Sequence, residues 1–143
     1  MNALFATPRN ASLTFARLVL ASIFFAHGAQ KALGWFGGAG FHGTMHMFTA
    51  WMHIPAVFAF LAIVAEFAGS LGLFVGFLTR IAAFGLVIVM LVAIFKVSLA
   101  HGLLGSPGHE GFEFPLSLLA LAFVVMVQGA GPLSIDRAIA PKT

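Results

Sequence analysis

The feature that most constrains this chain is a nearly unbroken apolar stretch from Pro55 to Phe77 with one carboxylate, Glu66, at its midpoint. A helix of about 20 residues crosses a hydrocarbon core of about 30 Å, so the stretch predicts a membrane-spanning helix. A carboxylate at that depth costs roughly 2.5 to 3.5 kcal/mol on insertion scales and should face a bundle interior or a wet cavity. We expect Glu66 to have a partner and to mark a functional site. A purely structural clamp between helices is the alternative.

The composition extends the membrane assignment to the whole chain. Of the 143 residues, 61% are hydrophobic and only 8% are charged, whereas about a quarter are charged in globular proteins. The formal net charge of +3 comes without any run of like charge, so we expect no nucleic-acid partner. The absence of cysteine excludes thiolate nucleophiles, disulfide exchange and cysteine-ligated metal clusters. Any redox role therefore requires a bound cofactor or substrate.

Apolar segments separated by turn residues predict an all-α fold, an integral membrane four-helix bundle that forms a single domain over residues 1–143. A cleaved signal peptide is the competing interpretation of the first segment, but Arg17 interrupts the layout that such a peptide requires. Between the first two spans, residues 34–54 indicate a short amphipathic helix that lies in the interface or folds over the bundle. The expected spans are residues 13–33, 55–77, 80–100 and 112–128.

The distribution of basic residues predicts the orientation of the bundle. Four spans place both termini on one side of the membrane, and only Lys31 and Lys96 lie toward the other side. By the positive-inside rule, we expect a multi-pass cell-membrane protein with both termini in the cytoplasm. The basic residues assigned to the cytoplasmic side are Arg9, Arg17, Arg80, Arg137 and Lys142.

Polar side chains from several expected spans converge in the outer half of the bundle. His27, Gln30 and Lys31 stand three and four residues apart, so they form one stripe on the first span. Glu66 should lie just below this layer, within reach of His27 from above and of Arg17 from below. The same layer receives polar residues from the ends of the third and fourth spans, namely Lys96, His101 and Glu113.

These residues divide into two groups of candidates. Long basic side chains can simply snorkel to the membrane surface, and a carboxylate at a helix start can serve only as a cap, so each candidate also has a structural interpretation. The candidates for proton transfer and catalysis are Glu66, His27 and Glu113. The candidates for ligand binding are Arg17, Gln30, Lys31, Lys96 and His101.

Two histidine patterns raise the question of a metal cofactor. His42, His46 and His53 fall close together on a helical wheel, a spacing that metal ligands use, but no carboxylate accompanies them. His27 and His101 could bracket a haem, although nothing else in the sequence supports one. We therefore expect neither a metal nor a haem.

Four stretches carry an ordered set of motifs: Arg17 to Gly38, Ala65 to Ile94 with its AEFAGSLGLFVGFLTR core, Gly111 to Ala120 (GFEFPLSLLA) and Gly131 to Arg137 (GPLSIDR). With these motifs the chain resembles the DoxX family of small bacterial four-helix membrane proteins. The resemblance implies a place in the cell inner membrane. Some members resemble the membrane subunit of thiosulfate:quinone oxidoreductase, and others are associated with quinone or oxidative stress.

The resemblance also points to particular residues, and it includes one departure. Family members often place Tyr beside the acid of the fourth span, but this chain has Phe112 and Phe114 there. A hydroxyl that could donate to a quinone carbonyl is therefore missing. The residues that the resemblance implies are Arg17, His27, Lys31, Glu66, Arg80 and Glu113.

Two hypotheses of different class follow. The first is a membrane oxidoreductase component that binds a quinone or a similar small redox molecule in the extracytoplasmic half of the bundle. His27, Lys31 or Lys96 would donate to the carbonyls, and Glu66 and Glu113 would carry protons. The second is a non-enzymatic membrane subunit that anchors or stabilises a partner complex. In both cases we expect contact with the lipid bilayer and with a partner subunit or further copies of the chain. The sequence leaves open whether the chain is an enzyme.

Overall fold

The computed structural model describes residues 2–140, and within that part of the chain the fold consists of helices and turns. The prediction of an all-α fold is confirmed, while Lys142 lies outside the described residues. The α-helices are α1 (Asn2–Phe5), α2 (Ala11–Leu33), α3 (Gly40–His46), α4 (Ala56–Val75), α5 (Thr79–Ala93), α6 (Glu113–Gln128) and α7 (Ile135–Ile139). Short 3-10 or π-helical segments are η1 (Trp35–Gly37), η2 (Met47–Trp51), η3 (Ile94–Ser98) and η4 (Leu99–His101).

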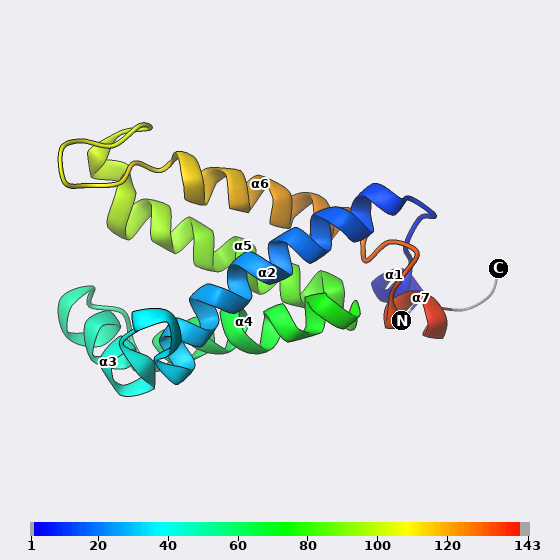
Figure 1. The fold of residues 1–143 in the computed structure, drawn as a ribbon, viewed down its shortest axis with the longest axis horizontal. Helices are drawn as coiled ribbons and strands as arrows, with labels where there is room; N and C mark the ends of the chain where they lie inside the picture. The colour runs from blue at the N-terminus through cyan, green and yellow to red at the C-terminus, as the bar shows by residue number, and fades with distance from the viewer. Residues whose placement is uncertain (1, 141–143) are drawn as a thin grey trace.

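Helices α2, α4, α5 and α6 extend along the length of the molecule and form a bundle (Figure 1). Packing runs from α2 to α4, from α4 to α5, from α5 to α6 and from α6 back to α2. The chain reverses between α4 and α5 at Gly76, whose φ of 67° glycine adopts without strain. Both described ends of the chain lie beside this turn, at what we call the terminal end. The segment containing α3 and the loop of residues 102–112 lie at the opposite, loop end (Figure 1).

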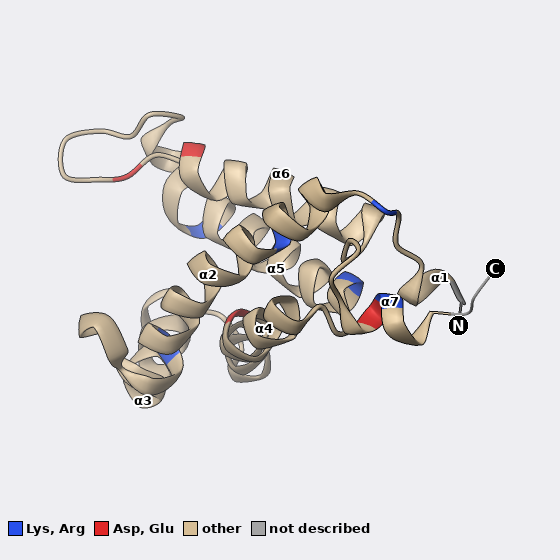
Figure 2. Ribbon diagram, turned by 45° about the vertical axis from the view of Figure 1, so that its right-hand side comes forward, with Lys and Arg blue, Asp and Glu red and all other residues tan. Residues whose placement is uncertain are grey.

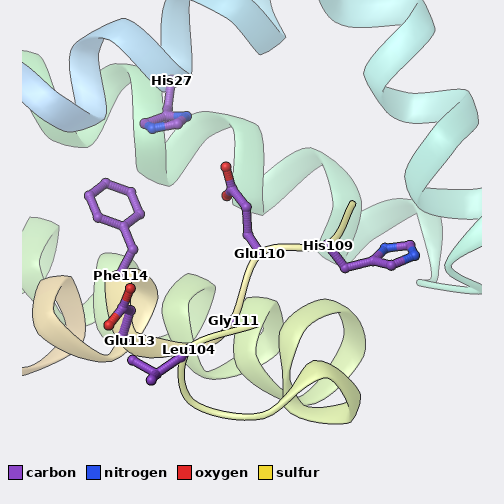
Figure 3. Close-up of a pocket in the computed structure, with 7 residues that line it drawn as sticks. All are labelled: His27, Leu104, His109, Glu110, Gly111, Glu113 and Phe114. Atoms are coloured by element: carbon purple, nitrogen blue, oxygen red, sulfur yellow. The ribbon is translucent and has the colours of Figure 1, made fainter. Parts of the chain in front are cut away.

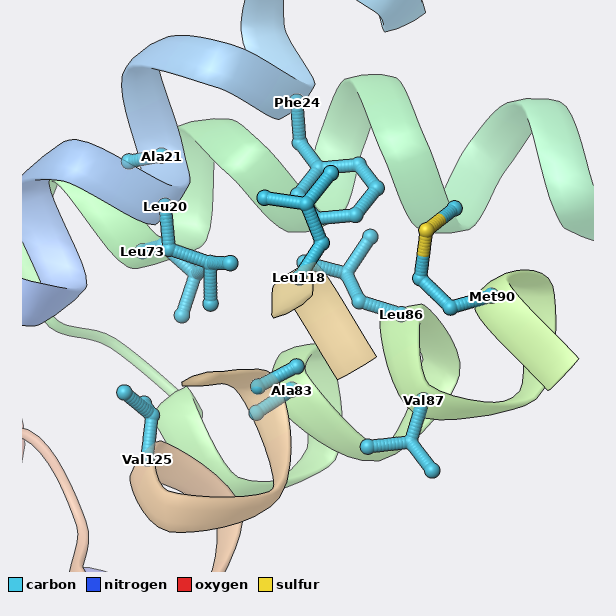
Figure 4. Close-up of a cluster of buried hydrophobic side chains, with 11 residues drawn as sticks. Leu20, Ala21, Phe24, Leu73, Ala83, Leu86, Val87, Met90, Leu118 and Val125 are labelled. Carbon is cyan, nitrogen blue, oxygen red and sulfur yellow. The ribbon is translucent and has the colours of Figure 1, made fainter. Parts of the chain in front are cut away.

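The core of the bundle is apolar and draws on all four long helices (Figure 4). Its buried members include Leu20 and Phe24 of α2, Leu73 of α4, Leu86 of α5 and Leu118 of α6, none of them more than 5% exposed. Lipid tails are as apolar as these side chains, so the core holds the bundle together mainly by van der Waals packing.

Small residues let the long helices approach closely. A Cβ atom on Gly28 of α2 would lie only 2.7 Å from the Cα of Phe67, so α2 rests directly on the α4 backbone. On the other side of α4, a Cβ on Gly85 of α5 would lie 3.2 Å from the Cβ of Ala65. Gly28 and Gly85 therefore let α2 and α5 pack closely against α4.

The lengths of the helices fit a multi-pass membrane protein. Three helical segments are long and apolar enough to cross a membrane: Ala11–Leu33, Ala56–Val75 and Thr79–His101. The fourth, α6, is apolar but has 16 residues and measures about 24 Å. The sequence predicted four spans; the structure gives three of full length and a shorter fourth that completes the bundle. Charged residues are sparse on the long helices (Figure 2).

The expected amphipathic segment is present and folds against the bundle. It is built from α3 followed by the π-helical η2. Phe48 of η2 packs with Ala59 and Ile63 of α4 in a second buried apolar cluster. His42 and His46 are exposed. The segment thus covers the start of α4 with its apolar face and leaves its histidines outside.

Candidate functional site

The buried carboxylate of Glu66 is paired with a lysine from the neighbouring helix. The Nζ atom of Lys31 on α2 donates to the Oε2 atom of Glu66 on α4 at 2.5 Å. The Glu66 side chain is 4% exposed, and that of Lys31 is 21% exposed. The carboxylate thus has a neutralising partner at a depth where an unpaired charge would be costly.

The close contact at Gly28 explains why this pair forms. Gly28 lies against the backbone of Glu66 and Phe67, so α2 and α4 are in contact at the level of the carboxylate. Lys31 follows Gly28 by three residues and therefore projects from the same side of α2, one turn further on. Its flexible stem then brings the ammonium group back to Glu66.

A cavity of about 550 Å³ lies at the loop end, beside the same face of α2 (Figure 3). In Figure 3 the His27 ring and the Glu110 carboxylate point toward each other from opposite walls, and the Phe114 ring lies beside them. The ring centroids of His27 and Phe114 are 6.4 Å apart. The lining residues are His27, Leu104, His109, Glu110, Gly111, Glu113 and Phe114.

Backbone hydrogen bonds hold the loop that forms one wall of this pocket. Phe112 N–H donates to the Gly102 carbonyl at 3.1 Å, and Glu113 N–H donates to the Leu103 carbonyl at 3.1 Å. The rings of His101 and His109 stack in parallel with centroids 4.3 Å apart. His101 therefore supports the wall through His109, although it is not itself a lining residue.

His27 connects the pocket to the buried ion pair. It stands four residues before Lys31 on α2, so the two side chains share one face of the helix. Lys31, Glu66 and Glu110 are all close enough to His27 to interact with it electrostatically. His27 thus lines the pocket together with Glu110 and Glu113, and it also lies near the Lys31–Glu66 pair.

Other residues expected at the site have different surroundings. Gln30 donates from Nε2 to the Phe36 carbonyl at 3.4 Å and so holds η1 against α2. Lys96 is exposed on η3 and does not line the pocket. Its position near the end of the third span predicted its depth but not the direction of its side chain, which the π-helical turn alters.

The two arginines expected to matter lie at the terminal end. Arg17 is 1% exposed and donates to the Leu133 carbonyl at 2.7 Å, so it does not approach Glu66 from below as expected. Arg80 donates to the carbonyls of Met126 and Val127, the last turn of α6, and to Ala6 at 2.8 Å. Both side chains join the chain ends to the bundle.

The three histidines with metal-like spacing do not form a cluster. Across residues 2–140, no three His, Asp or Glu side chains are placed to hold a metal ion together. The π-helical η2 separates His46 from His53, and His53 itself has a φ of 54°, outside the helical range. The uniform helical wheel that brought His42, His46 and His53 together therefore does not apply to this segment.

Sequence reasoning missed Glu110, His109 and Leu104 as pocket residues. They lie in a turn-rich loop, where helical periodicity gives no indication of the direction of a side chain. One signal was present: Glu110 precedes Glu113 by three residues, so two of the four acids in the chain lie just before α6 and at its first residue. Their proximity could have predicted an acidic mouth at the loop end.

Comparison with known proteins identifies one family. The family model described as DoxX matches residues 12–99, which is more than half of the chain. The match contains His27, Lys31 and Glu66, and it ends before the loop that carries Glu110. No curated protein and no solved structure matches the chain.

Proposed function

Because this chain belongs to the DoxX family, we propose that it binds a quinone or a similar small redox molecule at the loop end and serves as a component of a membrane oxidoreductase. The observation that carries the proposal is the pocket beside His27, in which an imidazole, two carboxylates and a phenylalanine ring converge. Its volume of about 550 Å³ falls within the range of about 300 to 1,000 Å³ typical of small-molecule sites.

The side chains of the pocket suit a flat ring that carries two oxygens. Phe114 and Leu104 offer apolar surface to the ring, and His27 offers a hydrogen bond to one oxygen. Glu110 and Glu113 are exposed, so they can exchange protons with water at the mouth. Of the three donors predicted from sequence, His27 is the one that we retain, because Lys31 is paired with Glu66 and Lys96 does not line the pocket.

Within this proposal, the Lys31–Glu66 ion pair helps to hold His27 in position. Lys31 and Glu66 join α2 to α4 next to His27, which orients the helix face on which the imidazole stands. Electrons leave through the bound molecule or a partner subunit, since the chain contains no cysteine for a cluster. We further propose that the terminal end faces the cytoplasm, because Arg9, Arg17, Arg80 and Arg137 belong to it.

Ligand analysis of the purified protein tests the proposal. The full chain is purified in mild detergent, its lipid extract is analysed for quinones, and the affinity for added menadione is measured. We expect co-purified quinone and saturable binding that His27→Ala weakens by about tenfold, because a hydrogen bond to the ring oxygen is lost. His53→Ala, an exposed histidine outside the pocket, serves as the matched control.

Two outcomes would contradict the proposal. One is a protein that carries no quinone and does not bind menadione. The other is binding that is equally strong in the His27→Ala and His53→Ala variants, which would place the ligand elsewhere. A ligand-free protein that is stable only together with another polypeptide would favour the non-enzymatic anchoring role.

A further inference from the structure

We propose that the pocket beside His27 prefers the reduced, uncharged quinol form of its ligand to the oxidised quinone, and that it rejects anionic ring compounds. This inference rests on the proposed function and specifies the chemical form of the ligand. Its basis is the imbalance between hydrogen-bond acceptors and donors on the pocket wall, together with the sign of the charge there.

The lining side chains are richer in acceptors than in donors. Glu110 and Glu113 are the carboxylates of the pocket, and an ionised carboxylate only accepts hydrogen bonds. A quinone ring has two carbonyl oxygens that also only accept, whereas a quinol has two hydroxyl groups that donate. A hydroxyl facing Glu110 or Glu113 therefore forms a charge-assisted hydrogen bond that the carbonyl cannot form.

Side-chain donors to a carbonyl are scarce in the same wall. A neutral His27 imidazole carries one N–H, and the His109 ring is stacked on His101 and turned away from the centre of the pocket (Figure 3). The chain contains no tyrosine, and the positions flanking Glu113 are Phe112 and Phe114. The His27 imidazole can thus form a hydrogen bond with either form of the ligand, whereas the carboxylates can accept a hydrogen bond only from the reduced form.

The charge of the wall argues against anions. Within residues 2–140, the pocket lining includes no Lys or Arg. The nearest lysine along α2 is Lys31, whose ammonium is held by Glu66 at 2.5 Å. Glu113 stands in the first turn of α6, where the helix dipole favours a negative charge, so the pocket keeps its acidic character. An anion entering here would meet two carboxylates without a free cation to offset them.

Competition between matched ligands tests this inference on the full chain in detergent. Dissociation constants are measured without oxygen at neutral pH for menadiol, for menadione and for a naphthoquinone sulfonate. We expect menadiol to bind about tenfold more tightly than menadione, the difference expected for one charge-assisted hydrogen bond, and the sulfonate to bind more weakly than both.

Conversion of each acid to its amide provides the decisive comparison. In Glu110→Gln and Glu113→Gln, a donor replaces part of the acceptor surface, so the preference for menadiol should fall toward equality and sulfonate binding should strengthen. Arg9→Gln, at the terminal end, changes the net charge by one unit without altering the wall and should leave the ratio unchanged.

The outcomes separate this inference from the proposed function. Menadione bound as tightly as menadiol, or a preference unaffected by both amide substitutions, would overturn the preference for quinol while leaving a quinone site in place. Sulfonate bound as tightly as menadione would overturn the rejection of anions. Failure of all three compounds to bind would contradict the proposed function itself.

Discussion

A carboxylate in the middle of a membrane helix is tolerated here because an ammonium group from the adjacent helix neutralises it. The Lys31–Glu66 contact of 2.5 Å joins two helices whose backbones touch at Gly28. Leaving one member of such a buried pair alone is more costly than replacing both members, because the remaining charge keeps its desolvation penalty without its partner. The two charges should therefore be strongly coupled.

A double-mutant cycle on this pair measures that coupling. Lys31→Met leaves Glu66 buried and unpaired, and we expect it to lower the stability of the folded bundle by about 3 kcal/mol. The double variant Lys31→Met, Glu66→Met removes both charges and should recover most of that loss. Thermal unfolding in detergent, followed by loss of helical signal, provides the comparison. If the double variant instead loses as much stability as Lys31→Met and Glu66→Met lose separately, added together, the two charges are not coupled.

The burial of Glu66 could be predicted from sequence, but its partner could not. An isolated acid within an apolar span should face the bundle interior and have a partner there, because a charge exposed to lipid is costly. The partner depends on how far α2 is shifted along α4, which is set by the contact of Gly28 with Phe67. From sequence spacing we predicted His27 and Arg17 as partners instead, because spacing does not show how far α2 is shifted along α4.

At the scale of the helices, the contact between α2 and α4 depends on the missing side chain of Gly28. A Cβ atom there would lie 2.7 Å from backbone atoms of Phe67, and a backbone cannot give way as the end of a side chain can. A substitution at this position therefore has to push the two helices apart. That movement would also stretch the Lys31–Glu66 contact, which lies one turn away.

Gly28→Ala should accordingly destabilise the bundle even though alanine favours helices. We expect a loss of about 2 kcal/mol from overpacking, measured by thermal unfolding in detergent, together with weaker menadione binding. The matched control is Gly69→Ala on α4, where the new Cβ would lie at an ordinary 3.8 Å from Ala82. That control should be neutral or slightly stabilising because of its helix propensity. Equal effects of the two substitutions would show that close packing at Gly28 is unimportant.

The long apolar helices could be predicted from sequence, but irregularities within them could not. Length and hydropathy located α2, α4 and the helical segment Thr79–His101 to within a few residues. The π-helical segments η2 and η3 carry no such signal, because they arise where tertiary packing favours an extra residue in a turn. As a result, His53 does not join the group of three histidines that a uniform helical wheel predicted, and Lys96 does not line the pocket.

For the molecule as a whole, the terminal end is held together by contacts between segments far apart in sequence. The Asp136 carboxylate accepts from the backbone N–H groups of Leu78 and Thr79 at 2.8 and 2.9 Å, which caps the start of α5. Arg80 ties the last turn of α6 to Ala6, and Arg17 reaches the Leu133 carbonyl. The two described ends of the chain therefore lie at the same end of the bundle, as expected if the chain crosses the membrane four times.

This arrangement predicts that α6 crosses the membrane despite its 16 residues. Helix α6 packs along α5, which is long enough to span, and it returns the chain from the loop end to the terminal end (Figure 1). A length of about 24 Å is short for a core of about 30 Å, but a bilayer can thin locally at modest cost. From the positive residues of the terminal end we predict that both termini lie in the cytoplasm.

Topology reporters test this prediction in a bacterial host. We expect green fluorescent protein to be fluorescent when fused at either terminus, because it folds in the cytoplasm, and alkaline phosphatase to be active when inserted after Gly108, in the loop, because its disulfides form only outside. A phosphatase that is active at the C-terminus while the N-terminal fusion is fluorescent would show that α6 does not cross. Phosphatase activity at both termini would instead reverse the orientation, and the acidic pocket would then face the cytoplasm.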